Sequence, residues 1–184
     1  MESKEYRLGF LVGRFQIIHS GHEEIIRKAI ELSGRTAVFV GSSQESGTAK
    51  NPFTYKMREE MLRRIFKDEI EIYPLPDLGA GNTCVWGKYV YQKVFESTGE
   101  FPDLFVSGEE TRRNAWFPAE MYPGMSELSI PKTTDISASR MRQFLISGDP
   151  ASWKYFTNPL LWDRYDELRG IILKYADVAE TASI

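Results

Sequence analysis

The sequence contains little of what disulfide-bonded, membrane-spanning or nucleic-acid-coating proteins require. Only one of its 184 residues is a cysteine, Cys84, so no internal disulfide can form and no cluster of thiolates is offered to a metal. No apolar run approaches the roughly 20 residues that cross a bilayer, and the first residues lack the layout of a signal peptide. With 23 basic and 26 acidic side chains, the net charge of -3 argues against a general nucleic-acid coat. These absences predict a cytoplasmic protein that binds neither membrane nor nucleic acid.

The length and the composition predict a folded globular chain. Apolar residues make up 42% of it and charged residues 27%, which are ordinary values for a folded domain. A chain of this length buries more than half of the surface that it exposes when unfolded. We expect one main domain over residues 1–150, with a small helical C-terminal extension, residues 151–184, packed on it.

Strand and helix patterns alternate along the chain. Short apolar runs predict strands at residues 6–12, 35–43, 69–76, 102–108 and 125–131. Helical periodicity or capping predicts helices within residues 23–32, 53–66, 84–95, 112–116, 136–149 and 159–174, with a strand as the alternative for 84–95. Because parallel strands need helical crossovers, this alternation predicts an α/β fold: a five-stranded parallel sheet with helices on both faces.

Several single residues predict where these elements begin and end. Thr54 is the expected N-cap of the second helix, while Gly34 and Gly148 are the expected C-terminal ends of the first helix and of the one over 136–149. Pro74 and Pro76 should stop the third strand. Residues 176–184 have little to bury and are expected to be loose.

Parallel sheets of this kind bind ligands beyond the carboxyl ends of their strands. Four segments fall at such ends, namely the one that follows residue 12 and those at 41–44, 74–77 and 106–110. We expect all four to meet in one crevice.

Both histidines of the chain, His19 and His22, stand at the turn from the first strand to the first helix. The start of a helix presents unpaired N–H groups and about half a positive charge, and both favour phosphate. Gly21 permits a close backbone approach to a ligand, and Arg14 offers a planar fork that binds phosphate through two hydrogen bonds. A satisfied surface pair is the alternative, as is a metal site, although a helical metal site prefers a spacing of four and a third ligand.

A second group of the same chemistry occupies residues 136–142. Ser137 and Ser139 stand at a predicted helix start and are followed by Arg140 and Arg142. Ser139 and Arg142 are three residues apart and so share one helix face, where a hydroxyl and a guanidinium suit phosphate oxygens. For Ser137 alone, an ordinary helix cap explains the residue equally well.

Together the two segments resemble the signatures of a known superfamily. Residues 13–22, "GRFQIIHSGH", resemble the GRFQPxHxGH signature of the nucleotidyltransferases that carry the HxGH motif, and "ISASRMR" resembles their ISxTxxR signature. Within that superfamily the chain is most similar to the archaeal-type nicotinamide-nucleotide adenylyltransferases, also in "GSSQESGTAKNPFTYKMREEML", "YPLPDL" and "VWGKYV". Ile17 replaces the usual proline and Ser139 the commoner threonine. The resemblance implies a Rossmann-like nucleotidyltransferase fold for residues 1–150.

The resemblance also implies the reaction. AMP passes from ATP to nicotinamide mononucleotide, or to nicotinate mononucleotide, forming a dinucleotide and pyrophosphate. The acceptor phosphate is already a nucleophile at neutral pH, so direct in-line displacement needs positioning and charge neutralisation rather than a general base. Implied with it are Mg²⁺, bound mainly through the ATP phosphates with no metal-ligating protein residue, and assembly into a homo-oligomer.

Site residues follow from the same resemblance. The implied catalytic residues are Arg14, His19, His22 and Arg142, with protonated imidazole as the best form to stabilise the transition state. The implied ATP-binding residues are Gly13, Phe15, Gln16, Gly21, Arg58, Ser137 and Ser139. Trp86 is implied to stack on the pyridinium ring of the acceptor, with Asp77 and Asn82 nearby. Without the resemblance, Arg58 is a solvated helix residue and Trp86 a core residue.

Two alternatives stay open. One is an enzyme of the same superfamily that transfers AMP or CMP to another phosphate, such as phosphopantetheine or an alcohol phosphate, and residues 77–90 would distinguish it. The other is a non-catalytic nucleotide-binding regulator, which the presence of His19, His22 and Arg142 disfavours. Residues 107–110 and 112–125 match no feature of the family, so the choice between the amide and the acid form of the acceptor stays open.

Overall fold

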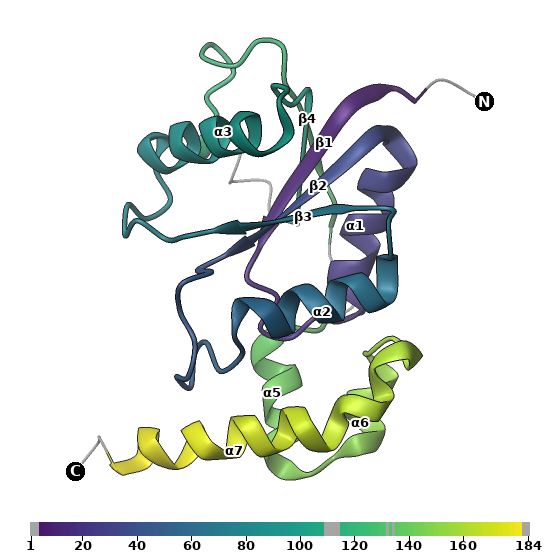
Figure 1. Cartoon of the computed structure of the whole chain (residues 1–184), viewed down its shortest axis with the longest axis vertical. Coiled ribbons are helices and arrows are strands. Elements are labelled where there is room, and N and C mark those ends of the chain that lie inside the picture. The colour runs from purple at the N-terminus through teal and green to yellow at the C-terminus, as the bar shows by residue number, and fades with distance from the viewer. Residues whose placement is uncertain (1–3, 109–114, 132, 134, 182–184) are drawn as a thin grey trace.

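A computed structural model describes residues 4–108, 115–131, 133 and 135–181 of the chain. Its centre is a parallel sheet of β1 (Tyr6–Gly13), β2 (Ser33–Gly41), β3 (Glu71–Leu75), β4 (Leu104–Ser107) and β5 (Ser126–Ser129). The strand order is β3-β2-β1-β4-β5, and the first four of these strands are labelled in Figure 1. The chain therefore runs outward from β1 to β3 and then crosses back to β4. The predicted five-stranded parallel fold is confirmed, and its order reverses between β1 and β4, where such sheets bind ligands.

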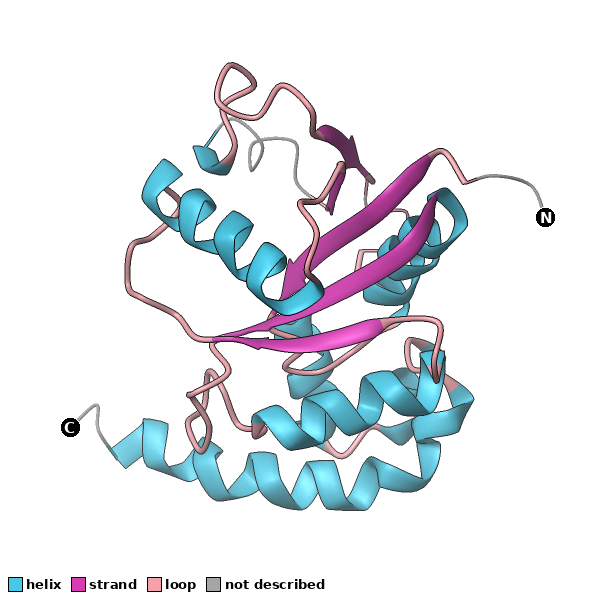
Figure 2. Ribbon diagram, turned by 45° about the horizontal axis from the view of Figure 1, so that its top comes forward, coloured by secondary structure: helices cyan, strands magenta, loops and turns pink. Residues whose placement is uncertain are grey.

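Helices cover both faces of this sheet (Figure 2). One face is covered by α1 (Ser20–Leu32) and α2 (Tyr55–Phe66). A further layer on the same side consists of α5 (Ala138–Ser147), α6 (Pro150–Tyr155), the 3₁₀ helix η1 (Pro159–Arg164) and α7 (Tyr165–Thr181). The other face is covered by α3 (Cys84–Thr98) and by residues 115–125. Within the described residues, no helix has both the length and the apolar character that crossing a bilayer requires.

The sheet separates two hydrophobic cores because successive side chains of a strand point to opposite faces. In β1, Leu8 and Phe10 join the core under α3, whereas Leu11 joins the core under α1 and α2. Both sets are buried. This two-sided burial explains why the strands are nearly continuous apolar runs rather than alternating ones.

The core under α3 depends on a very close approach at Gly87. A Cβ atom added there would lie 1.8 Å from the backbone carbonyl oxygen of Trp116, which is not the flexible end of a side chain. We expect Gly87→Ala to push the helix away from this segment and to lower the free energy of unfolding by about 3 kcal/mol, measured by urea denaturation. Gly170→Ala in α7 is the matched control, because an added Cβ meets nothing within 4 Å there. Equal effects of the two substitutions would show that the close approach to Trp116 is not what makes Gly87 necessary.

Most predicted boundaries are confirmed. The Oγ1 of Thr54 accepts a hydrogen bond from the Met57 N–H at 3.3 Å and so caps α2, and Gly148 ends α5 in the left-handed conformation at φ 71°. The alternative for 84–95 is decided in favour of a helix, α3. The short helix expected at 112–116 falls largely on residues outside the described ones.

Two boundary predictions are wrong. Gly34 does not end α1: the helix ends at Leu32, and Ser33 already pairs with Tyr6 as the first residue of β2. Pro74 does not stop β3 but lies within it, opposite Val40. An edge strand tolerates proline because one side of its backbone needs no partner, and β3 is an edge strand.

The C-terminal region is more regular than expected. α6 was not predicted, although Asp149 caps it by accepting a hydrogen bond from the Ser152 N–H at 3.0 Å. The helix expected over 159–174 is η1 followed by α7, which continues to Thr181. Residues 176–181, which were expected to be loose, continue the backbone of this helix. η1 packs on α2 and α7 packs on α5.

Candidate active site

The turn between β1 and α1 is held by arginines from two distant helices. Arg58, a fully buried residue of α2, donates hydrogen bonds to the carbonyl oxygens of Arg14 at 3.0 Å and Gly41 at 2.8 Å. Arg142, from α5, donates one to the carbonyl oxygen of Gln16 at 2.9 Å. The conformation of residues 13–16 therefore depends on guanidinium groups 44 and 126 residues further along the chain.

Gln16 uses its side chain inside the protein. Its amide nitrogen donates to the carbonyl oxygen of Phe53 at 3.1 Å, and its amide oxygen accepts from the Phe53 N–H at 2.9 Å. The residue is buried. The side chain thus fastens the turn to the segment before α2, and both of its polar atoms are already engaged there. This differs from the predicted contact with ATP, which the backbone of Gln16 can still make because the residue lines the cavity beside the histidines.

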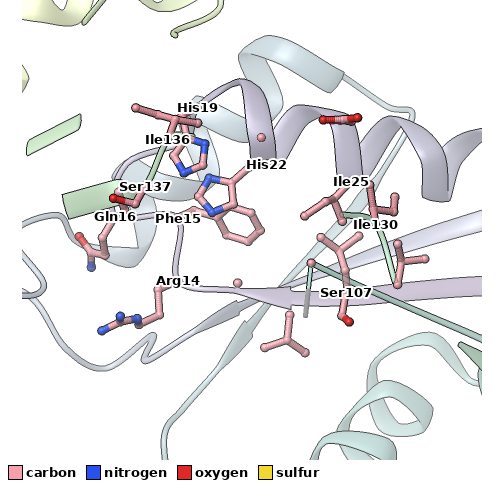
Figure 3. A pocket seen from close by; sticks show the side chains of 18 of the residues that line it. Arg14, Phe15, Gln16, His19, His22, Ile25, Ser107, Ile130, Ile136 and Ser137 are labelled. Carbon is pink, nitrogen blue, oxygen red and sulfur yellow. The ribbon is translucent and has the colours of Figure 1, made fainter. Parts of the chain in front are cut away.

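Phe15 has the backbone of a strained residue. Its φ is +50°, a conformation that bulky side chains rarely adopt. The ring folds back over Gly13, where an added Cβ would meet it at 2.7 Å, and its edge contacts the ring of His22 with centroids 5.0 Å apart. Gly13 therefore makes room for Phe15. Phe15 in turn supports His22, whose ring lies beside it in Figure 3.

The two histidine rings stack on each other. Their centroids are 3.9 Å apart and their planes differ by 28°. His19 is the residue before α1 and His22 lies in the first turn of the helix. A Cβ added to Gly21 would meet the His19 ring at 3.3 Å, so this glycine leaves space for the stack. Both imidazoles border the same cavity, beside Phe15 (Figure 3).

The start of α5 brings hydroxyls and a cation to this cavity. Ser137 is the N-cap, since its Oγ accepts from the Arg140 N–H at 3.2 Å. The Oγ of Ser139 accepts from Nη2 of Arg142 at 3.1 Å. Burial, and after it the Arg14 cation, lowers the pKa of Arg142. Two cations that repel each other beside a cavity favour the binding of an anion between them.

The cavity itself has a volume of about 330 Å³, within the usual range for small-molecule sites. Its polar end is bordered by Arg14, His19, His22, Ser137, Ser139 and Arg142. Its other end, where Figure 3 places Ile25, Ser107 and Ile130, is bordered mainly by apolar and small residues. The lining there also includes Val106, Gly108 and Pro131, with Glu24 and Thr133 as its polar members. It opens between the carboxyl ends of β1 and β4, where the strand order reverses.

Ten of the predicted site residues line this cavity. They are Gly13, Arg14, Phe15, Gln16, His19, Gly21, His22, Ser137, Ser139 and Arg142. At the apolar end, sequence reasoning placed residues 106–108 in the crevice but missed Ile25, Ile130 and Pro131. Val106, Ser107 and Gly108 belong to one of the four segments expected at carboxyl ends of strands, but no local signal connects them with Ile25 and Ile130.

Arg58 does not line the cavity, contrary to the prediction that it flanks the phosphates. Its guanidinium lies among the backbone carbonyls of Arg14, Gly41, Ser42 and Thr54. Burial, and after it the Arg14 cation, lowers the pKa of Arg58 to about 10. The structure therefore gives this arginine four backbone partners.

The three predicted acceptor residues form a separate group near the start of α3. Trp86 is buried, with its ring against those of Tyr89 and Trp116. The Oδ1 of Asn82 accepts from Nε1 of Trp116 at 3.2 Å. Asp77 accepts from the Gly79 N–H at 2.8 Å. None of Asp77, Asn82 and Trp86 is among the described residues that line the cavity.

The expected single crevice is therefore only partly formed. The cavity joins residues 13–16 with Ser107 and Gly108, but not with the segments at 41–44 and 74–77. Those two segments bind each other instead, since the Gln44 side chain accepts from the Asp77 N–H at 3.0 Å and donates to the Asp77 carbonyl oxygen at 3.1 Å.

Comparison with known proteins identifies the family. Residues 10–148 match the model of the cytidylyltransferase-like family. The chain belongs to this family. The predicted membership of the nucleotidyltransferase superfamily is confirmed.

Relatives in archaea agree with the narrower resemblance. A nicotinamide-nucleotide adenylyltransferase of Thermoplasma acidophilum is 30% identical over 155 residues, which cover 82% of this chain and 81% of the relative. One of Methanoculleus marisnigri is 27% identical, covering 89% and 92%. One of Saccharolobus solfataricus is 42% identical over 96 residues, and this match spans only 48% of this chain and 55% of the relative.

A solved structure has the same fold. The bifunctional NMN adenylyltransferase/ADP ribose pyrophosphatase of Francisella tularensis matches with a TM-score of 0.74 at 17% identity. The match covers 91% of this chain and 52% of the other, so this chain spans about half the length of that protein. At this identity the likeness supports the fold alone.

Proposed function

We propose that this chain transfers AMP from ATP to nicotinamide mononucleotide, releasing pyrophosphate and forming NAD. The observation that carries the proposal is the cavity in which stacked imidazoles lie close to two arginines at one end and apolar walls stand at the other. Archaeal relatives that match most of the chain are nicotinamide-nucleotide adenylyltransferases, which supports the same reaction. Nicotinate mononucleotide is the second acceptor that this chemistry admits.

The two ends of the cavity suit the two parts of ATP. The polar end offers guanidinium, imidazole and hydroxyl groups, all of which donate hydrogen bonds to phosphate oxygens. The other end is mainly apolar, and it is narrow because Gly108 lies close to Ile25. A Cβ atom added to Gly108 would lie 3.2 Å from the Cδ1 of Ile25. Ile25 and Ile130 would then enclose the adenine ring. In this orientation the α-phosphate lies between the two ends, near the imidazoles.

The reaction needs one displacement at phosphorus. An oxygen of the acceptor phosphate forms a bond to the α-phosphorus of ATP, and the bond from that phosphorus to the bridging oxygen breaks. The electron pair leaves with pyrophosphate. In the proposed mechanism His19 and His22 donate hydrogen bonds to the reacting phosphates, while Arg14 and Arg142 neutralise charge. The rate gain comes from positioning and from electrostatic stabilisation, and no residue has to remove a proton.

Trp86, Asp77 and Asn82 remain the proposed acceptor contacts. Stacking on a pyridinium requires one face of the Trp86 indole to be free, and in this structure the ring is buried beside Tyr89 and Trp116. The proposal therefore includes a rearrangement of Trp86 when the acceptor binds. The attraction between the pyridinium cation and the face of the indole would favour this rearrangement.

The proposed cofactor is Mg²⁺, held mainly through the phosphates of ATP. Among the described residues that line the cavity, Glu24 is the one carboxylate, and no group of three or more His, Cys, Asp or Glu in the described part could hold a metal. An ion that keeps water and phosphate ligands fits such a lining. Bound there, it would neutralise phosphate charge.

Removing divalent metal should therefore abolish turnover. We expect excess EDTA to lower the rate at least a hundredfold, since the phosphate charge is no longer neutralised, and added Mg²⁺ to restore it. The melting temperature of the ligand-free protein should not change, because the protein itself contributes few ligands. Full turnover in EDTA would contradict the proposed cofactor, and a large loss of stability would point to a structural metal.

Three further properties belong to the proposal. We propose a cytoplasmic location, and a nucleotidyltransferase domain (1–150) on which the extension (151–184) packs rather than forming a second domain. We also propose a homo-oligomer, supported by the exposed apolar side chains of Tyr155, Leu160 and Trp162 on the extension. Light scattering tests the oligomer, and a monomeric mass would contradict it.

Pyrophosphate release tests the proposed function. The protein is supplied with ATP and Mg²⁺, and nicotinamide mononucleotide, nicotinate mononucleotide, phosphopantetheine and glycerol 3-phosphate are offered separately. We expect release with a pyridine mononucleotide, together with the matching dinucleotide. Release only with another phosphate would keep the displacement and overturn the acceptor, whereas ATP binding without release in any mixture would favour the regulatory alternative.

A further inference from the structure

The C-terminal extension reaches the helix that carries the histidines. The N–H of Ser20, the first residue of α1, donates to the carbonyl oxygen of Phe156 at 2.8 Å. Phe156 belongs to the connection between α6 and η1. The side chain of His19, at the N-cap position, makes no capping hydrogen bond. One of the backbone N–H groups at the start of α1, which have no partner within the helix, therefore donates to a residue far away in the sequence.

A second contact joins the same two regions. The Nδ2 of Asn158 donates to the Oε2 of Glu23, in the first turn of α1, at 2.9 Å. The Oδ1 of Asn158 accepts from the Leu160 N–H at 3.0 Å and caps η1. One side chain thus connects the start of η1 to the first turn of α1, which contains His22 and directly follows His19.

The connecting residues 156–158, which we call the strap, are themselves anchored. The ring of Phe156 stacks on that of Phe144 in α5, with centroids 6.1 Å apart and planes 2° apart. The carbonyl oxygen of Thr157 accepts from Nε1 of Trp162 at 3.1 Å. α5 also carries Arg142. The strap therefore links the first turn of α1 to the helix that supplies the opposite side of the cavity.

We propose that Asn158 is a positioning residue for the transfer reaction, acting through Glu23 on the placement of His19 and His22 relative to Arg142. The inference rests on the proposed function of the cavity. Glu23 directly follows His22, so a displaced Glu23 moves the imidazoles with it. Misplacing reacting groups by about 1 Å can cost roughly a hundredfold in rate. The extension would then be part of the catalytic apparatus without touching substrate.

Isosteric substitutions test this pair. Asn158→Asp keeps the oxygen that caps η1 but places a carboxylate against Glu23. Glu23→Gln keeps an acceptor for Asn158 and serves as the matched control. The double variant Glu23→Gln with Asn158→Asp restores one hydrogen bond with its direction reversed. Among the wild type and these three variants, only Asn158→Asp lacks a hydrogen bond between the side chains at positions 158 and 23.

Steady-state kinetics with ATP, Mg²⁺ and nicotinamide mononucleotide are measured well below the melting temperature of each variant. We expect kcat of Asn158→Asp to fall by roughly ten- to a hundredfold with the KM for ATP little changed, and the double variant to recover most of it. A purely structural contact would lower the melting temperature and leave kcat of the folded protein unchanged. That result, or a double variant as slow as Asn158→Asp, would overturn the inference.

The imidazole NMR signals provide a readout that needs no turnover. The chain has only two histidines, His19 and His22, so every imidazole signal reports on the site. We expect these signals to shift in Asn158→Asp and to return in the double variant. If the wild type transfers AMP to no acceptor, the proposed function fails while the signals still test the contact. If the wild type is active and the signals are identical in all four proteins, the positioning inference alone fails.

Discussion

Substitution of His22 by alanine should lower kcat by roughly a hundred- to a thousandfold, the usual effect of removing one preorganised donor from a transition state. The ring of His22 is stacked on His19 and supported by the edge of Phe15, so its orientation is fixed before substrate arrives. In the proposed mechanism, removing it deletes a donor to the reacting phosphates. The KM for ATP should change much less, because Arg14 and Arg142, the proposed ligands of the triphosphate, remain in the cavity.

The measurement is turnover of folded protein, with thermal unfolding run in parallel. Arg140→Ala is a useful control, since Arg140 stands at the start of α5, is exposed, and is not among the described residues that line the cavity. It should keep nearly full turnover. Near-normal turnover in His22→Ala would remove this histidine from the mechanism, and equal losses in both variants would indicate a general charge or folding effect.

Arg58→Met should be the most destabilising substitution in α2. It removes four hydrogen bonds from a fully buried guanidinium to the carbonyls of Thr54, Arg14, Gly41 and Ser42. Each buried carbonyl left without a partner costs about 1–3 kcal/mol. We expect the free energy of unfolding to fall by about 3 kcal/mol or more, and kcat to fall as well because the turn that precedes His19 loses its support.

This substitution also separates two roles for Arg58. A phosphate ligand would raise the KM for ATP with little change in stability, and that outcome in urea denaturation and kinetics would contradict the structural role. Arg64→Met is the matched control. Arg64 lies in the same helix but is half-exposed and pairs with Asp163, so its loss should cost less than about 1 kcal/mol.

The contrast between Arg58 and Arg142 shows what sequence could and could not predict. Both arginines stand in segments that resemble the family, and a guanidinium binds a phosphate oxygen or a carbonyl oxygen equally well. Whether it does one or the other depends on burial, which is a property of the tertiary fold. Arg142 borders the cavity while also holding Gln16, whereas Arg58 lies wholly within the protein.

Local patterns predicted the parts of the site that are close in sequence. The turn at residues 13–22 and the helix start at 136–142 have recognisable chemistry within a few residues, and alternation of strands and helices placed the first of them at the carboxyl edge of the sheet. The apolar end of the cavity combines Ile25 with Ile130, and the strap brings Asn158 to Glu23. No periodicity or spacing relates such residues, because only the crossover connections bring them together.

The stacked histidines also allow a different chemistry, in which an imidazole attacks ATP and carries the adenylyl group before transfer. Exchange of labelled pyrophosphate into ATP, measured without any acceptor, separates the two mechanisms most directly. Direct transfer predicts no exchange until acceptor or dinucleotide is added, because pyrophosphate leaves only when the acceptor attacks. Rapid exchange without acceptor would show a covalent adenylyl-enzyme and would contradict direct transfer.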